Sequence, residues 1–91
     1  MSLKLYHIEQ DVNTGYDTYS DAIVCTESEE EARKWHPMGK YDYAEATKDD
    51  YEKKYDKYGS WCKKEYVKVT YIGEAKEGME AGIVCASFHA G

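Results

Sequence analysis

The chain of 91 residues is poor in arginine, phenylalanine, proline and cysteine, and it has no long apolar run. A membrane-spanning helix needs about 18 or more apolar residues in a row, so we expect none here. The N-terminus lacks a basic start followed by an apolar block, so we also expect no secretory leader. Three cysteines cannot all pair within one chain, which favours reduced thiols and a cytoplasmic location.

Patterns typical of catalytic or metal-binding proteins are also missing. No glycine spacing matches a phosphate-binding loop, a dinucleotide-binding loop or a nucleophile elbow. Cys85 and His89 could supply two metal ligands, but no Cys-x-x-Cys pair accompanies them. Cys25 and Cys85 lie in apolar runs, where a free cysteine is typically a small core residue. We therefore expect no metal, no cofactor and no enzymatic activity.

Acidic residues outnumber basic ones by 18 to 12, which gives a net charge of −6 with histidine neutral. Binding to duplex nucleic acid requires a basic face, so the charge argues against that function. Residues 1–31 hold eight acidic side chains and a single lysine, which predicts an acidic face. Only Arg33 is an arginine, so the chain is poorly equipped to clamp a polyphosphate with guanidinium groups.

Four segments have the pattern of β-strands. Alternating apolar residues predict strands over 3–10, 22–25 and 66–72. The fourth segment, Gly82–Phe88, is apolar on both faces, which predicts a strand in the centre of a sheet.

Two helices are predicted between the second and third strands. The first is predicted over roughly Ser28–His36, ended by Pro37. Two capping-box spacings, Thr26 with Glu29 and Ser28 with Glu31, leave its start open by two residues. A second is predicted over Thr47–Tyr58, within a Tyr/Lys-rich insertion that spans residues 38–65. The order β-β-α-(α)-β-β predicts one α+β domain over residues 1–91, with a helix on one face of an antiparallel sheet of about four strands.

Ten tyrosines and two tryptophans, against one phenylalanine, are the most informative excess. These side chains combine a large apolar face with a hydrogen-bonding tip, which suits binding surfaces, and their rings can stack on a nucleobase. The candidate partner-binding residues are Tyr51, Tyr55, Tyr58 and Trp61. The three tyrosines form one helical stripe, and the alternative that this stripe is simply core stays equally open. The candidate ligand-binding residues are Tyr16, Asp17, Tyr19 and His89.

Several segments together resemble a group of short, uncharacterised accessory proteins of bacteriophages and prophages. These segments are Tyr6–Asp11, Gly15–Ala22, Glu29–Arg33 and Ile83–Gly91. The likeness covers roughly the first 37 and the last 25 residues, with the Tyr/Lys-rich segment as a variable insertion. It implies a phage accessory protein in the cytoplasm of an infected or lysogenic bacterial host, and such proteins often counter host defences.

The leading hypothesis is a non-catalytic anti-defence protein that sequesters a small nucleotide-derived signal. The alternative is a protein–protein inhibitor of a host defence protein, acting through its Tyr-rich segment and acidic face. A domain of this size has little room for a pocket of its own, so we expect a site between protomers and hence a homo-oligomer. No duplex nucleic acid or membrane is expected as a partner.

Overall fold

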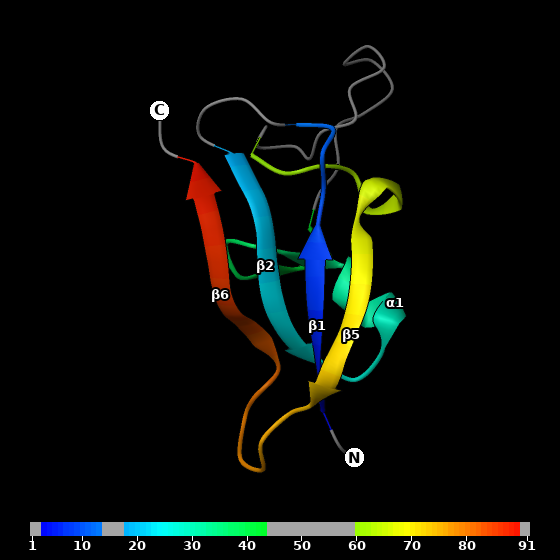
Figure 1. Ribbon diagram of the computed structural model, residues 1–91, viewed down its shortest axis with the longest axis vertical. Coiled ribbons are helices and arrows are strands. Elements are labelled where there is room, and N and C mark those ends of the chain that lie inside the picture. The colour runs from blue at the N-terminus through cyan, green and yellow to red at the C-terminus, as the bar shows by residue number, and fades with distance from the viewer. Residues whose placement is uncertain (1–2, 14–17, 44–59, 90–91) are drawn as a thin grey trace.

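A computed structural model describes residues 3–13, 18–43 and 60–89 of the chain. Their main element is a four-stranded antiparallel sheet with the strand order β5-β1-β2-β6 (Figure 1). The strands are β1 (Lys4–Glu9), β2 (Thr18–Thr26), β5 (Lys68–Glu74) and β6 (Gly82–His89). Together with one short helix, this sheet confirms the predicted α+β class.

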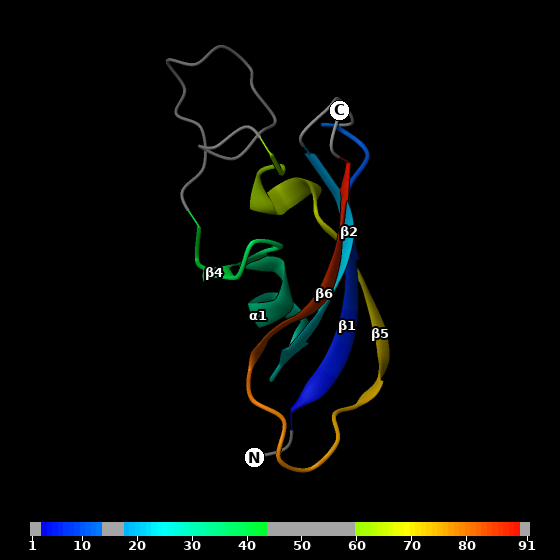
Figure 2. The ribbon, with the colours of Figure 1, turned by 90° about the vertical axis from the view of Figure 1, so that its left-hand side faces the viewer.

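One face of the sheet is covered and the other is open. The covering layer comprises the helix α1 (Glu29–Arg33), the hairpin of β3 (Trp35–His36) with β4 (Lys40–Tyr41), and the 3-10 turn η2 (Lys64–Tyr66). Figure 2 shows the sheet nearly edge-on, with this whole layer on one side. No helix in the described part of the chain is long and apolar enough to cross a membrane.

The core lies between the covered sheet face and this layer. Alternation along β1 and β2 sends Tyr6, Ile8, Ala22 and Val24 to the same side, and the register pairs Tyr6 with Val24 and Ile8 with Ala22. The indole of Trp61 closes the core from the layer side and has no exposed surface.

The predicted helix over Ser28–His36 is too long at its C-terminal end. The Ser28 hydroxyl caps it as expected, accepting from the amide of Glu31, but the helix ends at Arg33. Trp35 and His36 then turn back as a strand, with Gly39 at a φ of 96° in the turn. His36 becomes fully buried in this hairpin, which a continued helix would not allow.

The predicted position of Gly82–Phe88 in the centre of the sheet is wrong. The strand exists, but β6 lies at the edge, and β1 and β2 are the central strands. The sequence shows that both faces of β6 are apolar. The position of β6 in the strand order, however, depends on pairing between segments that are far apart in the sequence.

Arg33 and Lys64 tie the parts of the covering layer together. The Arg33 guanidinium donates to the carbonyls of Lys64 and Val67. The Lys64 ammonium donates to the carbonyl of Tyr43 at 2.9 Å and lies 3.1 Å from a carboxylate oxygen of Asp42. These contacts hold residues 60–67 against the helix and the hairpin.

The buried carboxamide of Gln10 organises the turn that follows β1. Its Oε1 accepts from the amides of Val12 and Asn13, at 2.9 and 2.8 Å. Its Nε2 donates to the carbonyls of Asn13 and Tyr19, at 2.7 and 2.8 Å. The Asn13 side chain in turn donates to the carbonyl of Trp61. One side chain therefore joins the end of β1, the start of β2 and, through Asn13, the covering layer.

Replacing Gln10 by glutamate tests this arrangement. Gln10→Glu keeps the shape and the acceptor but removes the donor, which leaves two carbonyls facing a carboxylate. We expect a loss of roughly 1–3 kcal/mol in the free energy of unfolding, measured by urea titration at pH 7. The control Asp11→Asn, at the exposed neighbouring position, should change it by less than about 0.5 kcal/mol. Equal stability of Gln10→Glu and the parent would show that the carboxamide is not an organising group.

Candidate functional site

The pairing of β2 with β6 brings two predicted ligand-site segments to one end of the sheet. Thr18 pairs with His89 and Tyr19 with Phe88, although about 70 residues separate them in the sequence. The start of β2 and the end of β6 therefore lie side by side. We refer to this as the loop end of the sheet.

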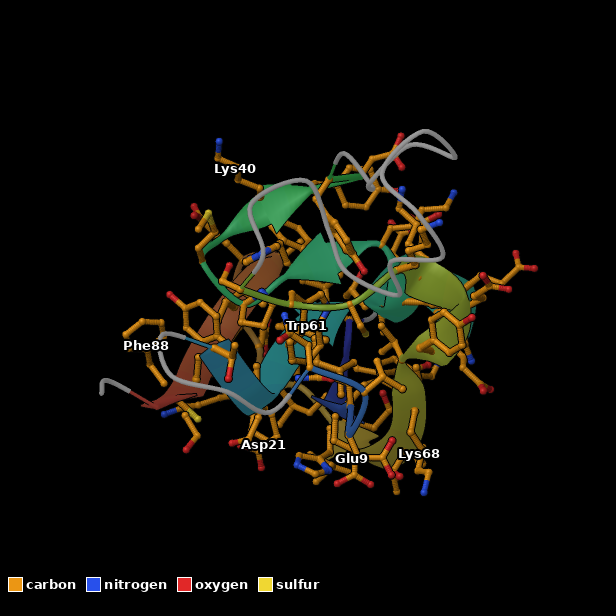
Figure 3. All side chains as sticks on the ribbon, turned by 90° about the horizontal axis from the view of Figure 1, so that it is seen from above. Glu9, Asp21, Lys40, Trp61, Lys68 and Phe88 are labelled. Carbon is orange, nitrogen blue, oxygen red and sulfur yellow. The ribbon has the colours of Figure 1, made fainter. Side chains whose placement is uncertain are left out.

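An aromatic pair marks the β6 side of the loop end. The rings of Tyr19 and Phe88 are 4.8 Å apart and tilted by 57°, and Phe88 is 47% exposed. Behind them lies His36, whose ring meets Tyr19 edge-on at 5.8 Å. Its Nδ1 accepts from the amide of Met38, so the proton sits on Nε2, which donates to the Ser60 hydroxyl. The exposed ring of Phe88 thus packs on Tyr19, which in turn packs on His36. Figure 3 shows Phe88 at the periphery of the molecule, seen from above.

The other predicted site residues lie either outside the described residues or away from the loop end. Tyr16 and Asp17 lie outside the described residues, as do Tyr51, Tyr55 and Tyr58 with the whole predicted helix Thr47–Tyr58. For His89 the structure places only the backbone, at the end of β6. Trp61, predicted to bind a partner, lies in the core instead, since its indole fills the space between sheet and layer. Its ring is not on the surface.

A hollow of about 190 Å³ opens at the β5 side of the same loop end. It is lined by Glu9, Gln10, Asp11, Tyr66 and Lys68. Tyr66 offers a ring, Lys68 an ammonium, and the two acids carboxylate acceptors. The sequence analysis missed this hollow, because its lining comes from two segments that only the pairing of β1 with β5 brings together.

A second, larger groove of about 420 Å³ lies near the opposite end of the sheet, between the hairpin and the connection to β6. It is lined by Leu3, Thr26, Glu27, Glu31, Trp35, Tyr41 and Ala81. Two aromatic rings and two carboxylates thus share one groove, which we call the acidic groove.

The rings and carboxylates of the acidic groove are coupled. Trp35 and Tyr41 meet edge-on with ring centres 5.2 Å apart. The Tyr41 hydroxyl donates to the Glu31 carboxylate, and this bond with the surrounding negative charge raises the pKa of Tyr41 to about 12. Lys34 lies 3.9 Å from Glu31 and partly offsets its charge. The indole N–H of Trp35 is buried and has no acceptor among the described residues.

The open face of the sheet carries a hydrogen-bonded pair of side chains. Nε2 of His7 lies 2.8 Å from a carboxylate oxygen of Asp21, and a carboxylate oxygen of Glu9 lies 4.0 Å from Nδ1. Within the described ranges, no three histidine, cysteine, aspartate or glutamate side chains gather as a metal-binding group.

The three cysteines differ in accessibility. Cys25 and Cys62 are fully buried and Cys85 is exposed on β6. Burial raises the pKa of the Cys25 thiol, which lowers its reactivity. Only Cys85 is therefore open to reagents.

No protein-family model, curated protein or solved structure matches this chain.

The hydrogen bond between Tyr41 and Glu31 predicts a measurable shift in titration. A phenolate beside Glu31 is repelled, so Glu31→Gln should lower the pKa of Tyr41 from about 12 toward the ordinary value of 10.0. Because the folded-state pKa is raised, the stabilisation is complete below pH 10 and is lost as the pH rises through 12. The measurement is a tyrosinate absorbance titration, with the curve of a Tyr41→Phe variant subtracted in each background. An unchanged pKa in Glu31→Gln would show that the bond does not form in solution.

Proposed function

We propose that this protein is a non-catalytic binding protein that sequesters a small nucleotide-derived signal at the loop end of its sheet. The observation that carries this proposal is the register of β2 with β6. It brings Tyr19 and the backbone of His89, two of the predicted ligand-binding residues, to the same end of adjacent strands. The resemblance to phage accessory proteins makes a signal of host defence the expected ligand.

The chemistry at the loop end fits such a ligand. The exposed ring of Phe88, backed by Tyr19, offers a surface on which a nucleobase can stack. At the opposite edge of this end of the sheet, the hollow offers Lys68 for a phosphate and Asp11 as an acceptor for sugar hydroxyls. The acidic groove, in contrast, would repel a phosphate.

Binding without turnover is the activity that these groups support. Potential nucleophiles and bases are kept apart: two of the three thiols are buried, and His7 with Asp21 occupies the flat open face. The hollow at the loop end is smaller than the ~300 Å³ of typical small-molecule sites, so it can enclose only part of such a ligand.

A thermal-shift panel of cyclic dinucleotides and ADP-ribose-type nucleotides tests the proposal. We expect at least one of them to raise the unfolding midpoint, since ligand at 100 times its Kd stabilises the native state by about 2.7 kcal/mol. After heat release, the ligand should have an unchanged mass, as sequestration requires. No shift with any member of the panel would overturn the proposal.

Phe88→Ala provides the matching variant. It should reduce the ligand-induced shift, because the stacking surface is lost. The control Ile72→Ala removes an exposed apolar side chain from β5, where no ligand contact is proposed, and should leave the shift unchanged.

The acidic groove favours a second candidate function, the inhibition of a host defence protein. A lysine or arginine of a partner placed beside Trp35 and Tyr41 would gain both cation–π and charge attraction, with Glu27 and Glu31 as counter-charges. The Tyr-rich segment remains a predicted part of that interface.

A fluorescent Lys/Arg-rich peptide is the probe for this second function. Glu27→Gln should weaken its binding about twofold to fivefold in fluorescence anisotropy, which corresponds to about 0.4–1 kcal/mol for an exposed charge pair. Glu65→Gln removes the same charge from η2, away from the groove, and should have no comparable effect. Equal effects of the two variants would indicate only a general attraction to a negative protein.

A further inference from the structure

The edge strand β6 has the composition of a buried central strand. Between Ile83 and Phe88 it carries no charged residue. Val84 is 50% exposed and Phe88 47%, and Cys85 is exposed as well. One row of backbone N–H and C=O groups faces away from β2, since β2 is the only neighbour of β6 among the strands that the structure describes. A long, uncharged edge of this kind is a template for another strand.

The opposite edge of the sheet is more protected by charge. β5 begins at Lys68 and ends at Glu74, whereas β6 carries no charged side chain from Ile83 to Phe88. Both edge strands have a register shift in their pairing, β5 around Ile72 and β6 around Val84, so irregular pairing does not distinguish them. Charged residues help to keep an edge from adding strands, so within the described residues β6 is the less protected edge.

We propose that β6 pairs antiparallel with β6 of a second copy of this chain, so that one sheet runs through both protomers. A second copy fits because it presents the same uncharged strand, so neither side brings a charge into the pairing. The assembly closes at two copies, since the two outer edges are then both the protected β5. This interface does not depend on the identity of the bound ligand.

Symmetry restricts the register of this pairing. Residues directly opposite each other in an antiparallel sheet point to the same face, so a two-fold axis normal to the sheet must place one residue opposite itself. The centre of Gly82–His89 falls between Cys85 and Ala86. Pairing about Cys85 places the two Cys85 residues opposite each other, about 5 Å apart. Pairing about Ala86 places them diagonally, about 7–8 Å apart.

The antiparallel pairing also places opposite ends of the two β6 strands side by side. The Phe88 end of one β6 comes beside the Gly82 end of the other. Gly82 lies against Trp35, since a Cβ built at Gly82 would be 3.9 Å from the indole. The aromatic pair of one copy therefore adjoins the acidic groove of its partner.

Cys85 provides the direct test. With Cys25 and Cys62 buried, a short bismaleimide applied to the intact protein should link two copies through Cys85 and yield a covalent dimer on denaturing gels. The control Cys85→Ser should yield none. A parent protein that stays uncrosslinked at concentrations where it is dimeric would overturn the proposed pairing.

Charge on the edge provides an independent test by light scattering on a sizing column. The double variant Cys85→Lys with Ser87→Lys places lysine opposite lysine in either register, so it should be monomeric. The matched double variant Thr70→Lys with Ile72→Lys carries the same charge on β5 and should remain a dimer. Circular dichroism tests whether each double variant is folded. If a variant is unfolded, the crosslinking of the parent protein through Cys85 tests the proposal instead. A monomeric parent, or a dimer in both variants, would contradict the proposal.

Discussion

The buried carboxamide of Gln10 is the contact on which the arrangement of the sheet depends. It hydrogen-bonds to two amides and two carbonyls in the turn after β1 and at the start of β2. By holding the carbonyl of Tyr19, it also fixes where β2 begins and so which residues of β2 face β1 and β6. The meeting of Tyr19 with Phe88 at the loop end follows from that register.

Local periodicity was enough to predict most of the fold. The strands over 3–10 and 66–72, the Ser28 cap and the α+β class all follow from side-chain alternation and capping chemistry within a few residues. Two features depend on distant contacts and were predicted incorrectly. Trp35 and His36 leave the helix and pair with β4 in a hairpin, where His36 is fully buried and Trp35 partly buried. β6 lies at the edge because β1 already has β2 and β5 as neighbours.

The site was predictable only in part for the same reason. The aromatic loop before β2 and the C-terminal end of β6 stand out in the sequence, but their proximity requires the strand register. The hollow combines Asp11 with Lys68, and the acidic groove combines Glu31 with Ala81, so no local pattern could reveal either. Trp61 shows the converse: a tryptophan in a polar, Tyr-rich segment resembles a surface anchor, but its ring fills the core. β6 has the apolar composition of a central strand although it lies at the edge of the monomer's sheet. In the proposed dimer it would lie at the centre of the continuous sheet.

The central claim is that a nucleotide-derived ligand is held at the loop end without being changed. A crystal structure of the protein with a nucleotide that stabilises it tests this claim most directly. The account predicts an intact ligand with its base against Phe88 and Tyr19, at the end of the sheet where β2 begins. A ligand bound only in the acidic groove or on the open face, or a cleaved ligand at the loop end, would contradict it.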